Sequence, residues 1–226
     1  MTKFFEGGWI DYEILKLVDY YDPILREPTV PFDFDAHPAK DALSIAFTLV
    51  ETMDKYGGLG LSANQVGLRH RVCVINMGKE AWTLFNPRIV RSSLTPSQFQ
   101  EGCLSYPGLF LKVHRSDSIT VQFQALNGQV VEQDFSGLTA VCIQHEIDHL
   151  DGVMYTDKVS PIKLEQAKRK VKKNLKKMKL QVNNFAPRTE QKEVTTETKK
   201  NTPEIQILEP STTTQKEPEK FVYKVG

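Results

Sequence analysis

Residues 138–150 read LTAVCIQHEIDHL, and this stretch decides the fold of the chain. Its apolar side chains cover most of the circumference of a helix, and Gly152 follows where a glycine commonly ends one. A helix that is apolar on nearly all sides belongs in the interior of a protein. We therefore expect a buried helix with the remaining elements packed around it.

Two histidines of this helix are placed to share a metal ion. His145 and His149 are four residues apart, so their imidazoles lie on the same helical face and can converge on one ion. Glu146 is adjacent, where its carboxylate can reach a water held by that ion without being a ligand. The alternative is a pair of hydrogen-bonded core histidines. Burying so many polar side chains without a task is costly, which favours the metal site.

A catalytic site of this kind usually has three protein ligands, so a third must be found. In one group of metalloproteases it is a histidine six residues after the second, but Tyr155 stands there in this chain. A thermolysin-like site takes a glutamate from a later helix, and Glu165 is a weak candidate because its helix is typical of a surface element. Cys103 offers a thiolate that suits a borderline-soft divalent ion. Taken alone, it could equally be a small buried apolar residue.

The other local patterns predict an α+β fold. Apolar residues at helical spacing, followed by Gly57-Gly58, predict an amphipathic helix over about 38–56. Residues 72–75 and 82–85 are typical of short strands. Alternation over 119–125 before the turn pair Asn127-Gly128 predicts a hairpin that returns at Val130. We expect antiparallel β-sheets packed around the central helix that carries HEIDH, plus a C-terminal helix.

That C-terminal helix is predicted over about 161–180. Ser160 can cap it and Pro161 suits its first turn. One stripe of the helix is apolar and comprises Leu164, Ala167, Val171, Leu175 and Met178. Residues 181–226 are rich in Thr, Glu, Lys, Gln and Pro without any period, so we expect a disordered tail behind a single domain of residues 1–180.

The composition is typical of a globular protein and gives no indication of a secreted or membrane-spanning one. With 40% hydrophobic residues among 226, the chain can build a core, and its net charge of +1 gives no bulk argument for nucleic-acid or membrane partners. No secretory signal or membrane-length apolar run is visible, so the cytoplasm is the expected location. The three cysteines, Cys73, Cys103 and Cys142, suit a reducing compartment, and we interpret the first and last as small core residues.

Three segments together resemble the motifs of the peptide deformylase family. They are GLGLSANQ at 58–65, EGCLS at 101–105 and HEIDH at 145–149, against the family's GxGLxAxQ, EGCLS and HExDH. The likeness runs from about Leu15 to Leu180. It implies a hydrolase that removes the formyl group from the N-terminal formyl-methionine of nascent polypeptides and releases formate. A zinc peptidase with the same helix and a non-catalytic metal-binding protein are the alternatives.

The resemblance implies a role for each matched residue. The ligands of one divalent ion would be Cys103, His145 and His149, with Fe(II) implied and Zn(II), Ni(II) or Co(II) able to fill the same site. Glu146 would take a proton from the attacking water and give one to the departing amine. The Gln65 side chain and the Leu104 backbone N–H would hold the oxyanion formed at the formyl carbon.

The substrate would be held on both sides of this centre. Gly60 would pair with the peptide backbone like an added strand. The implied methionine pocket consists of Leu59, Phe99, Leu138, Val141 and Cys142. Glu101 and Arg115 match a family pair that steadies the metal-binding loop.

Three positions depart from the commonest bacterial pattern. Ser62 replaces an alanine, Tyr106 an aliphatic residue and Phe110 an arginine. None of these changes removes a catalytic group. They bear on substrate preference beyond methionine, because we expect Tyr106 and Phe110 to border the cleft.

The C-terminal helix is strongly basic. Helix 161–180 carries nine lysines and arginines against one acid, Glu165. A solvated face is the ordinary interpretation of such a run. The resemblance adds a second, because bacterial deformylases dock on ribosomal RNA through a helix in this position, and basic side chains give salt-sensitive affinity for phosphate. We expect a monomer with no membrane partner.

Overall fold

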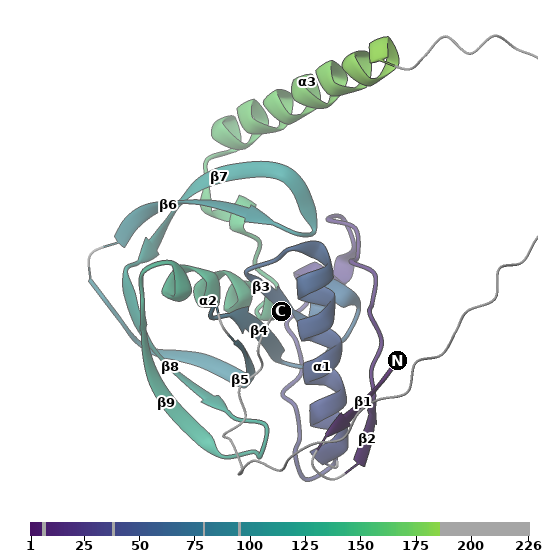
Figure 1. Ribbon diagram of the computed structural model, residues 1–226. Helices are drawn as coiled ribbons and strands as arrows, with labels where there is room; N and C mark the ends of the chain where they lie inside the picture. Colours follow the sequence, from purple (N-terminus) through teal and green to yellow (C-terminus); the bar gives the residue numbers. More distant parts are fainter. Residues whose placement is uncertain (6–7, 38, 79, 95, 186–226) are drawn as a thin grey trace, which may run out of the picture.

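A computed structural model describes residues 1–5, 8–37, 39–78, 80–94 and 96–185. Three antiparallel sheets are present in this part of the chain (Figure 1). The largest has the strand order β3-β4-β5-β8-β9, with β3 at Gly60–Ser62, β4 at Val72–Asn76, β5 at Ala81–Ser92, β8 at Ser118–Gln124 and β9 at Val130–Ser136. The two-stranded sheets pair β1 (Thr2–Phe5) with β2 (Gly8–Asp11), and β6 (Pro96–Cys103) with β7 (Tyr106–Ser116).

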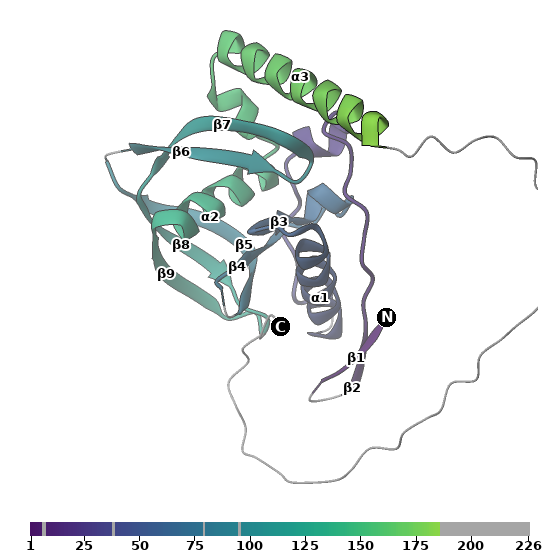
Figure 2. The ribbon, with the colours of Figure 1, turned by 45° about the horizontal axis from the view of Figure 1, so that its top comes forward.

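The HEIDH helix is central, as predicted. This helix, α2 (Gly137–Leu150), lies between the five-stranded sheet and the β6–β7 hairpin (Figures 1 and 2). One of its faces packs Ile143 and Leu150, both fully buried, against strand residues such as Leu84. Burying a side chain of this size contributes about 1.5–3 kcal/mol relative to leaving it exposed. The α+β fold with antiparallel sheets around a buried helix is thus confirmed.

Helix α1 (Ala39–Tyr56) begins one residue after the predicted start and ends where expected. It stops at Gly57, whose φ of 67° lies in the left-handed region that a side chain would strain. Its buried Leu49 and Met53 pack with Leu61 of β3. This contact fixes the GLGLSANQ segment between α1 and α2.

Some strands match the prediction, one is longer than predicted and one hairpin was missed. The β8–β9 hairpin is confirmed, including the turn at Asn127-Gly128, where Gly128 has a φ of 78°. Strand β5 continues seven residues past the predicted end at 85, beyond Asn86, which adopts a φ of 51°. The β6–β7 hairpin was not predicted at all. Both strands alternate in burial, but their inward-facing residues include Glu101 and Arg115, and these charged side chains hide the apolar pattern.

Helix α3 (Pro161–Phe185) continues five residues past the predicted end, so residues 181–185 of the expected tail are helical and the remainder lies outside the described residues. Its stripe packs through Leu164, Ala167 and Val171 onto the β7 side of the molecule. Leu175, expected on the same stripe, is 50% exposed, because the helix extends away from the body (Figure 1). The side chain of Met178 is not described. None of the helices in the described ranges is long and apolar enough to cross a membrane.

Candidate metal centre

Three predicted ligands come together in the interior. Strand β6 ends at Cys103 in the tight turn into β7, and α2 supplies His145 and His149 from one face. One ligand atom from each of these buried residues lies within 4.8 Å of the other two. The Cys103 Sγ atom is 3.2 Å from Nε2 of His149. Cys103 therefore converges with two histidines that lie 42 and 46 positions later in the sequence.

A network of ion pairs orients His145. The Nδ1 atom of His145 is 2.8 Å from Oε2 of Glu101, which leaves Nε2 for the centre. Arg115 donates two hydrogen bonds to the Glu101 carboxylate, from Nε at 2.7 Å and from Nη2 at 2.9 Å. Its Nη1 also pairs with Asp148, whose Oδ2 is 3.0 Å from Nζ of Lys158. The predicted Glu101–Arg115 contact is present, whereas the contribution of Asp148 and Lys158 was missed.

Burial and hydrogen bonds shift the pKa values of three residues in this network. Burial alone would raise the pKa of Glu101, but hydrogen bonds from Arg115 and His145 lower it to about 2. Burial would lower the pKa of His145, yet its hydrogen bonds with Cys103 and Glu101 raise it to about 10. Burial, followed by the charge of His145, holds the pKa of His149 well below its usual range. That histidine is consequently neutral, the form in which an imidazole binds metal.

The residues fit a divalent metal ion. One sulfur and two imidazoles make the three-ligand set of a catalytic centre, with a fourth position left open to water or substrate. Such a mixed set suits borderline-soft ions and not Mg²⁺ or Ca²⁺, which prefer oxygen ligands. The Nδ1 atom of His149 is buried and has no hydrogen-bond partner among the described residues. The His149 ring is therefore held by packing and by the contact of its Nε2 atom with the Cys103 sulfur.

Glu146 lies beside the ligands and is 3% exposed. The Ser62 hydroxyl is 2.6 Å from its Oε2 atom. A Cβ atom built on Gly60, also in β3, would come within 2.6 Å of Oε1, so the carboxylate lies directly against the backbone of this strand. Burial raises the pKa of Glu146, against the opposing effects of His145 and the Ser62 hydrogen bond. A raised pKa makes the carboxylate a stronger proton acceptor than an exposed glutamate.

The Gln65 amide also points into the centre. Its nitrogen is 3.4 Å from the Cys103 sulfur and 3.2 Å from the Ser105 hydroxyl, while its oxygen accepts a hydrogen bond from the Ser62 backbone at 2.9 Å. The amide is thus fixed with its N–H groups directed at Cys103 and Ser105. Leu104 occupies the β6–β7 turn, and its side chain packs against Gly58, where an added Cβ would be 2.8 Å away.

The predicted pocket residues come from three elements. Leu138, Val141 and Cys142 share one face of α2, Phe99 lies on β6, and Leu59 precedes β3. Val141 is buried, whereas Leu59 and Leu138 are 53% and 63% exposed. The Cys142 sulfur would be 2.8 Å from a Cβ on Gly60, which places this part of α2 directly beside β3. Cys73, in contrast, is fully buried in the core.

The residues considered as alternative ligands lie elsewhere. The Tyr155 hydroxyl donates to the Leu109 carbonyl at 2.9 Å, and its ring packs 5.5 Å from that of His145. Glu165 is exposed on α3 and is 3.8 Å from Lys168.

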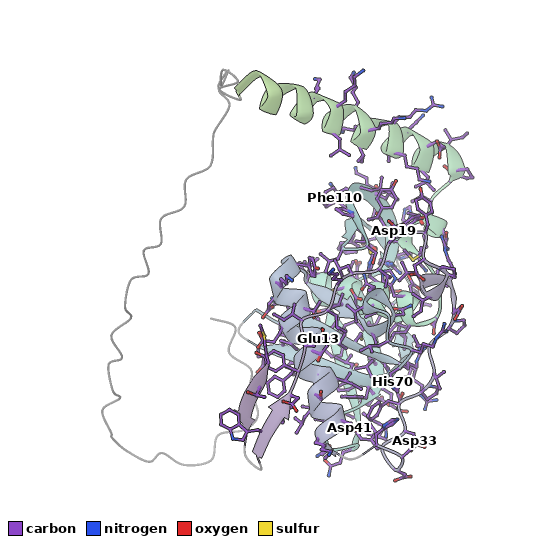
Figure 3. The ribbon with its side chains drawn as sticks, turned by 90° about the vertical axis from the view of Figure 1, so that its right-hand side faces the viewer. Glu13, Asp19, Asp33, Asp41, His70 and Phe110 are labelled. Atoms are coloured by element: carbon purple, nitrogen blue, oxygen red, sulfur yellow. The ribbon has the colours of Figure 1, made fainter. Side chains whose placement is uncertain are left out.

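Phe110, which was expected to border the cleft, is 59% exposed and lies at the end of the molecule next to α3 in Figure 3. Its ring would be 2.7 Å from a Cβ on Gly102.

Comparison with known proteins gives one family. The polypeptide deformylase family model matches residues 14–165. Peptide deformylase 2 of Xanthomonas campestris is 40% identical over 168 residues, which cover 71% of this chain and 95% of that protein. The crystal structure of a peptide deformylase from Legionella pneumophila has a TM-score of 0.66 at 34% identity, covering 75% of this chain and 98% of its own. One from Synechococcus elongatus, in complex with actinonin, has a TM-score of 0.64 at 36% identity and covers 69% and 85%.

Proposed function

This chain belongs to the polypeptide deformylase family, and from that premise we propose that it hydrolyses the N-formyl group of formyl-methionine at the start of nascent polypeptides, releasing formate. The observation that carries the proposal is the convergence of Cys103, His145 and His149, with the Gln65 amide directed at Cys103 and the Glu146 carboxylate buried next to His145 in the sequence. This set provides a cation site, a proton acceptor and an oxyanion partner for amide hydrolysis.

Each residue of the site has a separate role in the proposed reaction. Glu146 accepts a proton from the attacking water and delivers it to the amine nitrogen as the C–N bond breaks. The Gln65 side-chain N–H and the Leu104 backbone N–H stabilise the oxyanion that develops on the formyl oxygen. A bound divalent ion supplies Lewis-acid polarisation and lowers the pKa of water. We propose Fe(II), with Zn(II), Ni(II) and Co(II) as ions that the same ligands can hold. Elemental analysis of anaerobically purified protein, with activity measured in the same sample, tests the identity of the ion.

The substrate lies along the free edge of β3 in this proposal. Strand β3 is at the edge of its sheet, so the Gly60 backbone can pair with an extended peptide. The methionine side chain would contact Leu59, Phe99, Leu138, Val141 and Cys142. A side chain at Gly60 would also displace Glu146, because an added Cβ would be 2.6 Å from its carboxylate.

An assay separates this function from that of a zinc peptidase. Metal-loaded protein should release formate and a free amine from formyl-Met-Ala-Ser, and should leave acetyl-Met-Ala-Ser and unformylated Met-Ala-Ser intact. Cleavage of the Met–Ala bond instead would support the peptidase.

We also propose that the enzyme is a cytoplasmic monomer whose helix α3 docks on ribosomal RNA. Along α3, Lys170, Lys173 and Lys177 are exposed, while its apolar stripe is used for packing. Replacing these three lysines by glutamate should reduce ribosome co-sedimentation at low salt and leave deformylation of a short peptide unchanged. Unchanged pelleting would exclude docking through α3. Sedimentation velocity tests the monomer.

A further inference from the structure

The Ser62 hydroxyl makes an unusual contact for a residue at the end of a strand. Ser62 is fully buried, and its Oγ atom lies 2.6 Å from Oε2 of Glu146 and 2.9 Å from the backbone carbonyl oxygen of the same residue. Both acceptors belong to Glu146, 84 positions away in the sequence. An alanine, the usual residue at this position, could make neither contact.

The two oxygens of Glu146 therefore have different surroundings. Oε2 receives the Ser62 hydroxyl, whereas Oε1 lies on the side of Gly60, where an added Cβ would be 2.6 Å from it. Gly60 is on the edge strand that faces the proposed substrate. A hydroxyl has one proton to donate, and the contact with Oε2, at 2.6 Å, is shorter than the contact with the backbone carbonyl, at 2.9 Å, so we assign the proton to Oε2.

We propose that Ser62 is a positioning residue for Glu146, which holds Oε2 and thereby assigns proton transfer to Oε1. The inference rests on the proposed function, in which Glu146 cycles one proton. An O–H bond of the attacking water breaks and its proton goes to Oε1, while the Ser62 hydroxyl continues to donate to Oε2. When the formyl C–N bond breaks, the proton leaves Oε1 for the amine nitrogen. Ser62 exchanges no proton in either step.

The packing around Glu146 explains why one hydrogen bond from Ser62 is enough to orient its carboxylate. Gly60 and Cys142 crowd the β3 side of the carboxylate, since the Cys142 sulfur would be 2.8 Å from the same added Cβ. The carboxylate is consequently confined at Oε1 by the packing around Gly60 and at Oε2 by the Ser62 hydroxyl, both of which belong to β3. Without the hydroxyl, rotation toward the Ser62 side becomes available, and Oε1 spends less time in the reactive orientation.

The test compares Ser62→Ala with Thr156→Val in the metal-loaded full chain. Thr156 is 2% exposed, and its hydroxyl is 2.7 Å from that of Tyr20, so it controls for the loss of a buried hydroxyl away from the centre. With formyl-Met-Ala-Ser, Ser62→Ala should lower kcat about tenfold, equivalent to about 1.4 kcal/mol, with KM and metal content unchanged. Thr156→Val should keep the wild-type kcat.

A crystal structure of Ser62→Ala supplies a readout that does not depend on turnover. It should show the Glu146 carboxylate rotated or in two orientations, against one in the wild type. An unmoved carboxylate, or an unchanged kcat with a raised KM, would overturn the proposal. A wild-type protein that does not deformylate the peptide would instead contradict the proposed function, and the carboxylate orientation would still decide the role of Ser62.

Discussion

Replacing Arg115 by methionine tests whether the buried ion-pair network holds the metal centre together. The Arg115 and Glu101 side chains are 3% and 5% exposed and are joined by two hydrogen bonds. Among the side chains that the structure describes, removing the guanidinium leaves the buried Glu101 carboxylate with His145 alone as a partner, and Asp148 with Lys158 alone. Breaking a buried pair in this way costs about 3–5 kcal/mol, because the remaining charge is no longer compensated.

The matched control is Arg91→Met. Arg91 pairs with Glu132 at 2.7 Å, but these side chains are 69% and 42% exposed. An exposed pair contributes about 0–1 kcal/mol, so this variant should unfold in urea close to the wild type.

Two measurements follow from this comparison. Urea unfolding at neutral pH should give a free energy of unfolding about 3–5 kcal/mol lower for Arg115→Met. Competition with a chelator should give metal affinity about 10–100-fold lower, because Glu101 no longer orients His145. Equal losses for the Arg115 and Arg91 variants, or full metal retention in Arg115→Met, would refute the reasoning.

Three further predictions concern pH, the β3 edge and the packing of α3. The folded-state pKa of Glu101, about 2, lies below its ordinary value of 4.5, so its stabilisation is complete above about pH 4.5 and is lost as the pH falls toward 2, roughly 3 kcal/mol in all. Urea midpoints should fall across that window, and a flat profile would contradict the assignment. Gly60→Ala should lower kcat/KM at least about tenfold while the protein stays folded by circular dichroism, because the new Cβ displaces Glu146. Leu109→Ala should cost about 2–5 kcal/mol and Leu175→Ala less than about 0.5 kcal/mol in thermal unfolding, since Leu109 is fully buried and Leu175 is half exposed; similar losses would mean that α3 packs along its whole stripe.

The parts of the fold that local sequence determines were predictable. The spacing of His145 and His149 is a property of one helix, and the Asn127-Gly128 turn is a property of one hairpin. The third ligand was different, because nothing local ties Cys103 to α2. It was identified through the joint occurrence of three motifs, and the structure places its sulfur 3.2 Å from His149.

The parts that depend on contacts between distant segments were missed. Ser62 was noted only as a departure from alanine, yet it contacts Glu146 from 84 positions away. Asp148 lies within the HEIDH motif, but its pairing with Arg115 depends on the β6–β7 hairpin, which was not predicted. That hairpin is difficult to recognise because the inward-facing positions of β6 include Ser97 and Glu101, so its alternation in burial is not an apolar alternation in sequence. A pairing pattern of this kind is decided by tertiary packing and not by local propensity.

The most direct test of the central claim is formate release by the wild type and by Glu146→Gln at equal metal content. Glutamine keeps the size of the buried side chain but cannot accept the proton from water. The wild type should release one formate for each free amine formed from formyl-Met-Ala-Ser, and Glu146→Gln should lose at least about a hundredfold in kcat. Equal rates in the two proteins, or amine formed without formate, would contradict the account.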